Sequence, residues 1–162
     1  MSIYSKKLIT IFSWFFGKIK GALGRYRMRS LIKNVGNSSR CPLSVELKCP
    51  ENISIGHHVS IGPYSTIGAF EQVILEDYVR ISKGVIIETA GLNLKSGLPY
   101  KHKGKPILIK KGAWLGARCV VLGGVTIGQG AIIGAGAIIS KDIPDFAIVV
   151  SQPTRIIGDT RD

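Results

Sequence analysis

Histidine is the residue type in this chain best suited to move a proton near neutral pH, because an unperturbed imidazole has a pKa of about 6.5. The chain of 162 residues has three histidines, of which His57 and His58 are adjacent. His102 lies alone in a lysine-rich stretch at residues 88–107, which has no acidic residue after Glu88. We expect His102 to act as a general base, with a solvated loop histidine as the alternative, and the adjacent pair to be exposed turn residues.

Other reactive side chains give weaker signals. Three histidines, two of them adjacent, do not provide the converging ligands that a zinc enzyme needs, so we expect no metal site. The cysteines Cys41, Cys49 and Cys119 form no CxxC pair and cannot complete a disulfide framework. We expect them to be structural residues of a protein in a reducing, cytoplasmic compartment. No nucleophile elbow surrounds a serine or a cysteine.

A repeat of six residues indicates which secondary-structure elements position the candidate residues. Between residues 53 and 144 an aliphatic residue stands at every sixth position, apart from one step of eight and one step of 22 residues. The repeated positions are Ile55, Ile61, Ile67, Leu75, Ile81, Ile87, Ile109, Leu115, Val121, Ile127, Ile133 and Ile139. Glycine often follows directly, and a small or β-branched residue usually stands four positions later.

A period of six fits neither an α-helix nor an ordinary hairpin protein. It predicts short strands joined by corners, with one side chain per strand facing inward and successive coils stacking into a solenoid. The step of 22 residues marks an insertion at about residues 88–107. Departures from regularity in a solenoid are where function is usually carried, so we expect this loop to contribute to a site.

Two stretches, "ISIGHHVSIGPYSTIG" and "AWLGARCVVLGGVTIGQGAIIGAGAIISKDIP", resemble the hexapeptide-repeat acyltransferases. The resemblance covers roughly residues 35–158 and is closest to galactoside, maltose and polysaccharide O-acetyltransferases. It implies an all-β fold, a left-handed parallel β-helix solenoid with a protruding loop. It also implies acetyl-CoA as co-substrate without a metal, and a homotrimer whose active site lies between two subunits.

Acyl transfer to a hydroxyl needs a base that takes the hydroxyl proton. In galactoside-type relatives the catalytic histidine stands near the beginning of the loop, where this chain has Ala90. His102 lies nearer the end of the loop, so either the loop folds differently and brings it to the same cleft, or another group serves. Asn93 and Tyr100 are expected to contact the acceptor, and Glu88 is a candidate for orienting the base.

The resemblance also assigns residues to the acetyl-CoA side. The family's oxyanion donor is a backbone amide that corresponds to Ala117, and Trp114 matches a tryptophan that borders the active site. A second backbone contact, to the pantetheine arm, corresponds to Ala135. Lys141 and Arg155 match basic residues near the CoA phosphates, although the residues before Arg155 depart from the family's usual ending.

The N-terminal segment, residues 1–33, has a character of its own. It holds eight basic residues and no acidic one, whereas the whole chain has a net charge of +12, so the remainder is only weakly basic. This uneven distribution, without any nucleic-acid-binding motif, argues against a nucleic-acid partner. We take residues 34–162 as the β-helix acyltransferase domain.

Apolar residues at helical spacing predict an amphipathic helix within residues 1–33. They are Leu8, Ile11, Phe12, Phe15, Ile19 and Leu23, with Trp14 and Phe16 beside them. The apolar run is too short to span a bilayer. Two interpretations remain open: peripheral contact with an anionic membrane, or packing against the domain or a neighbouring subunit.

The resemblance and the basic helix together predict an acetyl-CoA-dependent O-acetyltransferase that acts on a sugar hydroxyl in bacterial surface polysaccharide biosynthesis. We expect a cytoplasmic protein, with peripheral contact at the inner face of the membrane. The acceptor stays open. The alternatives are N-acetylation of an amino sugar, a serine-type O-acetyltransferase, and a non-catalytic β-helix scaffold.

Overall fold

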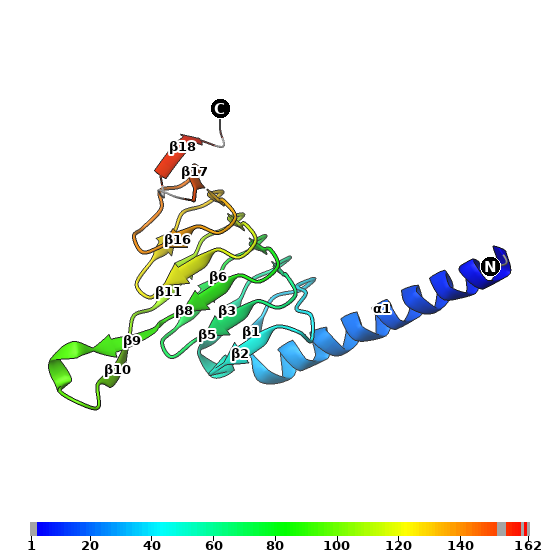
Figure 1. Ribbon diagram of the computed structural model, residues 1–162, viewed down its shortest axis with the longest axis horizontal. Helices are drawn as coiled ribbons and strands as arrows, with labels where there is room; N and C mark the ends of the chain where they lie inside the picture. The colour runs from blue at the N-terminus through cyan, green and yellow to red at the C-terminus, as the bar shows by residue number, and fades with distance from the viewer. Residues whose placement is uncertain (1–2, 152–154, 160, 162) are drawn as a thin grey trace.

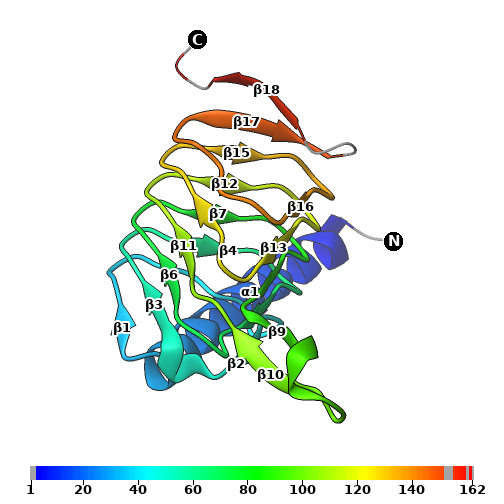
Figure 2. The same ribbon diagram turned by 90° about the vertical axis from the view of Figure 1, so that its left-hand side faces the viewer.

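The structure, a computed structural model, describes residues 3–151, 155–159 and 161 of the chain. In this part of the chain the long helix α1 (Ile3–Leu31) leads into a stack of short strands (Figure 1). The chain winds through about six coils, and three sheets form the sides of the stack (Figure 2). The expected solenoid with an N-terminal helix and a protruding loop is therefore confirmed.

The middle coils each contribute one strand to each sheet. Sheet A consists of β1 (Asn34–Val35), β3 (Ile53–Ile55), β6 (Val73–Leu75), β11 (Ile107–Ile109) and β14 (Thr126–Ile127). Sheet B consists of β4 (Ser60–Ile61), β7 (Arg80–Ile81), β12 (Trp114–Leu115), β15 (Ile132–Ile133), β17 (Ala147–Val150) and β18 (Arg155–Asp159). Sheet C consists of β2 (Glu46–Lys48), β5 (Thr66–Gly68), β8 (Ile86–Glu88), β13 (Val120–Leu122) and β16 (Ile138–Ile139).

The six-residue repeat sets the register of the coils. Parallel neighbours pair the repeated aliphatic positions directly, as in Ile67 with Ile87 on sheet C. The repeated side chains from Ile55 onward are buried and form one continuous core. Because a solenoid coil has apolar faces that only the next coil covers, this column explains why the pattern runs through most of the chain.

Two of the three cysteines belong to this core. Cys41 and Cys119 are buried, and Cys49 is exposed. Burial raises the pKa of the Cys41 thiol to about 11, with a smaller opposing effect of the Arg27 charge. Burial likewise raises the pKa of Cys119 to about 12. Both thiols are therefore protonated near neutral pH and serve as small apolar side chains.

Each end of the solenoid is covered. At the N-terminal end, Met28 and Ile32 are buried against the first coil, and Arg27 donates hydrogen bonds to the carbonyl oxygens of Leu43 (3.0 Å) and Val45 (2.9 Å). At the other end, β18 pairs antiparallel with β17. The expected boundary near residue 33 follows the end of α1, and independent folding of residues 34–162 stays a prediction.

The insertion between β8 and β11 forms a hairpin that projects from the side of the stack (Figure 1). Its strands are β9 (Ala90–Asn93) and β10 (Lys101–Gly104), and a short 3-10 helix, η2 (Leu94–Ser96), follows β9. A second 3-10 helix, η1 (Pro50–Asn52), lies between β2 and β3. The hairpin leaves the solenoid where sheet C turns into sheet A.

Candidate active site

The base of the hairpin is held by Thr89, whose side chain is only 2% exposed. Its hydroxyl donates to the carbonyl oxygen of Gly68 (2.9 Å) and accepts from the amide of Glu71 (2.9 Å). The amide of Lys105, where the chain returns, donates to the Thr89 carbonyl oxygen (3.1 Å). Both arms of the hairpin are therefore fixed to the C–A corner of the solenoid.

His102 lies on β10 opposite Leu92 and is exposed. Its ring lies beside that of Phe70, with 6.2 Å between the centroids. Within the described residues its imidazole makes no hydrogen bond. Glu88, the candidate for orienting it, instead accepts from the amide of Ala90 (3.1 Å) at the base of the hairpin.

Phe70 was not singled out from the sequence, although a signal was present. It stands in the step of eight residues that interrupts the repeat, where the chain has two residues more than the period of six requires. Its ring is the surface on which the His102 imidazole rests. Phe70 is thus the aromatic neighbour of the candidate base.

The tip of the hairpin is ordered by its own polar groups. Asn93 accepts through its side-chain oxygen from the amide of Lys95 (3.2 Å). The Ser96 hydroxyl donates to the Asn93 carbonyl oxygen (2.8 Å) and accepts from the amide of Lys101 (2.9 Å). Tyr100 is exposed beside them. The predicted acceptor residues Asn93 and Tyr100 therefore share one tip with the strand that carries His102.

The predicted oxyanion donor lies at a different corner, where sheet B turns into sheet C. Ala117 and Ala135 occupy the same position in turns on adjacent coils, and the amide of Gly136 donates to the Ala117 carbonyl oxygen (2.8 Å). The next residue in each turn has a positive φ, 58° at Arg118 and 71° at Gly136. Such turns resemble type II, in which the first central residue takes an ordinary backbone conformation.

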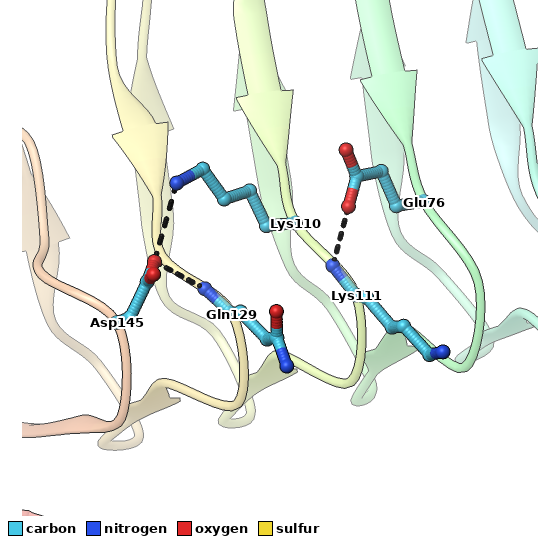
Figure 3. Close-up of polar contacts among 5 residues, drawn as sticks. All are labelled: Glu76, Lys110, Lys111, Gln129 and Asp145. Atoms are coloured by element: carbon cyan, nitrogen blue, oxygen red, sulfur yellow. Dashed lines mark hydrogen bonds and ion pairs between the residues drawn. The ribbon is translucent and has the colours of Figure 1, made fainter.

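Neither Ala117 nor Ala135 donates its amide to an acceptor in the described part of the chain. The equivalent amides at the A–B corner are capped by carboxylates, as Figure 3 shows. Glu76 accepts from the amide of Lys111 (2.8 Å), and Asp145 accepts from the amide of Gln129 (2.9 Å). The B–C corner thus presents two uncapped amides, one coil apart.

The A–B corner is occupied by structural interactions. The amide of Gln129 and then the Lys110 side chain (3.2 Å) hold the pKa of Asp145 below its usual value. His57 accepts from the amide of Asn37 (3.0 Å), and His58 stacks on Tyr78 with 4.9 Å between ring centroids. Both histidines are exposed turn residues, as expected, and their rings are engaged in corner contacts.

Trp114 lies on the outer face of sheet B and is 50% exposed. Its indole nitrogen donates to the Ser82 hydroxyl (3.0 Å), which is part of the B–C corner one coil earlier. The indole therefore borders the corner that carries Ala117. Trp114, Ala117 and Ala135 form one surface, which we name the amide corner.

The other predicted residues lie elsewhere. Lys141 is exposed at the C–A corner after β16, the same side of the solenoid as the hairpin. Arg155 begins β18, and its side chain lies outside the described part of the chain. Sheet C separates the hairpin from the amide corner, so one copy of the chain does not bring His102 and Ala117 together.

Over residues 3–151, 155–159 and 161, no group of three or more His, Cys, Asp or Glu side chains is arranged to hold a metal ion. In the same residues no helix has the length and apolar content to cross a membrane.

Comparison with known proteins places this geometry in context. Residues 106–141 match the family model of the bacterial transferase hexapeptide (six repeats). A galactoside O-acetyltransferase of Escherichia coli (strain K12) is 33% identical over 122 residues, which cover 70% of this chain and 60% of the relative. A serine acetyltransferase of Buchnera aphidicola subsp. Schizaphis graminum is 33% identical over 141 residues, which cover 84% of this chain and 52% of the relative. The chain thus spans little more than half the length of these curated relatives.

The match to a solved structure covers a larger share of that protein than the matches to the curated relatives do. A hexapeptide-repeat-containing acetyltransferase from Vibrio cholerae O1 biovar eltor, complexed with acetyl-coenzyme A, has a TM-score of 0.80 and 26% identity. The match covers 85% of this chain and 77% of that one. The chain carries a six-residue repeat, and in sequence and fold it is similar to hexapeptide-repeat acetyltransferases.

Proposed function

We propose that this protein transfers an acetyl group from acetyl-CoA to a hydroxyl group. The observation that carries the proposal is the pair of uncapped amides at Ala117 and Ala135. Coils stack about 4.8 Å apart, the spacing of neighbouring strands, so the two N–H groups form a short ladder along the solenoid axis. Carbonyl oxygens of a thioester and of an extended pantetheine arm fit such a ladder as acceptors.

Each residue of the proposed site has a separate role in the reaction. Acetyl-CoA supplies the acetyl group as a thioester. His102 takes the proton of the acceptor hydroxyl while the hydroxyl oxygen attacks the carbonyl carbon of the thioester. The Ala117 amide stabilises the negative charge that develops on the carbonyl oxygen. When the carbon–sulfur bond breaks, His102 returns the proton to the departing thiolate. Ala135 holds the pantetheine arm.

The remaining groups bind the two substrates. Lys141 and Arg155 neutralise the CoA phosphates, and their charges suit phosphate oxygens. Trp114 borders the acyl group, while Asn93 and Tyr100 contact the acceptor from the tip of the hairpin.

The site requires two copies of the chain. His102 and Lys141 lie on the C–A side and the amide corner lies across sheet C, so a second copy must bring its hairpin to the amide corner of the first. A closed ring of three copies repeats this contact at each interface. We therefore propose a homotrimer with three equivalent sites.

The acceptor that similarity favours is a sugar hydroxyl, because a galactoside O-acetyltransferase is among the relatives. We propose a glycan of a bacterial surface polysaccharide as the acceptor. The similarity to a serine acetyltransferase over most of this chain favours the serine hydroxyl as a second candidate.

CoA release from acetyl-CoA tests the activity and the acceptor together. The purified protein is assayed with galactosides, maltose, an amino sugar and serine, each against a no-acceptor blank. We expect sugar-dependent release with an ester product. Release with serine alone would select the second candidate, and no release with any acceptor, together with no acetyl-CoA binding, would leave a non-catalytic scaffold.

A further inference from the structure

Helix α1 has one face that fits the solenoid. A built Cβ on Gly24 would lie 2.2 Å from the Cys41 carbonyl oxygen, so only glycine permits this approach. Met28, one turn later on the same face, is buried. A groove of about 650 Å³ continues between Gly17 and Gly21 of α1 and the first coils. Small residues thus mark the side of α1 that faces the body.

The opposite side of α1 carries an apolar stripe. At 3.6 residues per turn, its members fall within an arc of about 100°. The apolar stripe consists of Phe12, Phe15, Phe16, Ile19 and Leu23. Their exposed fractions lie between 40% and 61%. The first half of α1 extends beyond the solenoid (Figure 1), and Ile19 and Leu23 in its second half are 40% and 50% exposed.

Basic side chains accompany the apolar stripe. Lys18, Arg29 and Lys33 are exposed, and no acidic residue occurs in residues 1–33. Lys18 extends over the Trp14 ring, with its ammonium 3.8 Å from the ring centroid. Apolar residues flanked by lysine and arginine are the composition of helices that lie in a membrane interface.

We propose that α1 docks this protein on an anionic lipid surface. The apolar stripe enters the boundary between headgroups and acyl chains, and the flanking cations meet the lipid phosphates. The face bearing Gly24 and Met28 stays on the solenoid, so the coils remain in water on the other side of the helix. This orientation leaves the hairpin and the amide corner free for substrates.

Charge complementarity selects lipid over a second copy of α1. A second α1 would bring the same eight positive charges of residues 1–33 against the first, without any acid to pair with them. Like charges across an interface repel, whereas an anionic bilayer attracts those that face it.

Flotation of the full-length protein with vesicles tests the proposal. The vesicles contain phosphatidylcholine alone or with about one-third phosphatidylglycerol, at low and high salt. We expect flotation with the anionic vesicles and little with the neutral ones. Phe12→Ser with Phe16→Ser should abolish flotation at both salt concentrations. Arg29→Gln with Lys33→Gln should lower partitioning at low salt by about fivefold for each charge removed.

Leu98→Ser is the matched control, since Leu98 is 83% exposed but lies on the hairpin, and it should float as the unchanged protein does. Circular dichroism and sedimentation of each variant check folding and oligomer size. The proposal is overturned if the full-length protein does not float, or if the double phenylalanine variant floats equally well. It is also overturned if that variant dissociates the oligomer without changing flotation, because the apolar stripe would then be covered by another copy.

Discussion

The Ala117 amide belongs to a turn whose counterpart two coils earlier has Pro63 in the same place. Residues 61–64 and 115–118 match position by position, and the residue after Pro63 and after Ala117 has φ of 59° and 58°. Proline suits the first central position of such a turn, so Ala117→Pro removes an N–H and keeps the backbone. We expect kcat to fall by about 10²- to 10³-fold, the usual loss for one oxyanion donor.

Ala117→Ser is the control for this change, because it alters the side chain and retains the amide. It should keep kcat close to that of the unchanged protein, and both variants should show the same thermal unfolding. A proline variant that turns over normally would remove Ala117 from the mechanism.

His102→Ala should lower kcat by about two to four orders of magnitude, the contribution of a positioned general base, with acetyl-CoA affinity nearly unchanged. His57→Ala is the comparison, since His57 caps the Asn37 amide at another corner and should leave kcat alone. Steady-state rates and acetyl-CoA titration measure both. Normal turnover of His102→Ala, with loss of activity in the His57 variant, would place the base elsewhere.

The buried cysteines predict a pH dependence of stability. The pKa of Cys119 in the folded protein is raised from 9.0 to about 12, so folding favours its protonated form. The stabilisation that the protonated Cys119 thiol gives the folded state is complete below pH 9 and is lost as the pH rises toward about 12. The free energy of unfolding should therefore fall over that range. Urea unfolding at several pH values measures it. Cys119→Ala, which fits the small-residue pattern of the repeat, should flatten the decline, and an equally steep decline would refute this origin.

At the level of single residues, the sequence was informative where the family match was specific. It predicted Ala117, Ala135 and Trp114, which the structure brings to one surface. It could not show that the two amides are uncapped, because capping depends on which carboxylates of neighbouring coils stand over a turn. The contact of Phe70 with His102 depends in the same way on how the hairpin folds back.

Among the elements, the hairpin depends most on one side chain, Thr89. Thr89→Val loses the hydroxyl that links Gly68 and Glu71. The Gly68 carbonyl oxygen keeps the Thr89 amide as donor, but the partly buried Glu71 amide loses its acceptor, which costs about 1 kcal/mol. We expect that loss of unfolding free energy, faster tryptic cleavage within the hairpin, and a lower kcat. Thr66→Val removes a more exposed hydroxyl bonded to Glu46 and should have a small effect. Equal behaviour of the two variants would contradict the anchoring role.

Strands within the six-residue repeat could be predicted from the sequence, whereas strands outside the repeat could not. The coils could be predicted from the six-residue repeat. Each strand must point one apolar side chain into the core, and this requirement places an aliphatic residue at every sixth position of the sequence. The hairpin was expected only as an irregular insertion, because residues 90–104 contain no repeat. The antiparallel pairing of β18 with β17 was not foreseen for the same reason.

At the scale of the whole molecule, the solenoid is a three-sided stack whose sides lie between corners of different character. Carboxylates cap the A–B corner, uncapped amides line the B–C corner, and the hairpin leaves the C–A corner. The proposed base on one corner and the proposed oxyanion donor on another cannot meet within one stack. We therefore propose that the site is shared between two copies of the chain.

Mixed oligomers of His102→Ala and Ala117→Pro test that claim most directly. Each variant alone lacks one of the two groups at every site. In a trimer that contains both variants, an interface regains both groups when the first variant supplies the Ala117 amide and the second supplies His102. A closed ring of either mixed composition has one such interface, about one-third of the total. We predict that differently tagged, co-purified mixed trimers recover about that fraction of the normal CoA-release rate. Mixed trimers with no more activity than either parent would contradict a site shared between two copies.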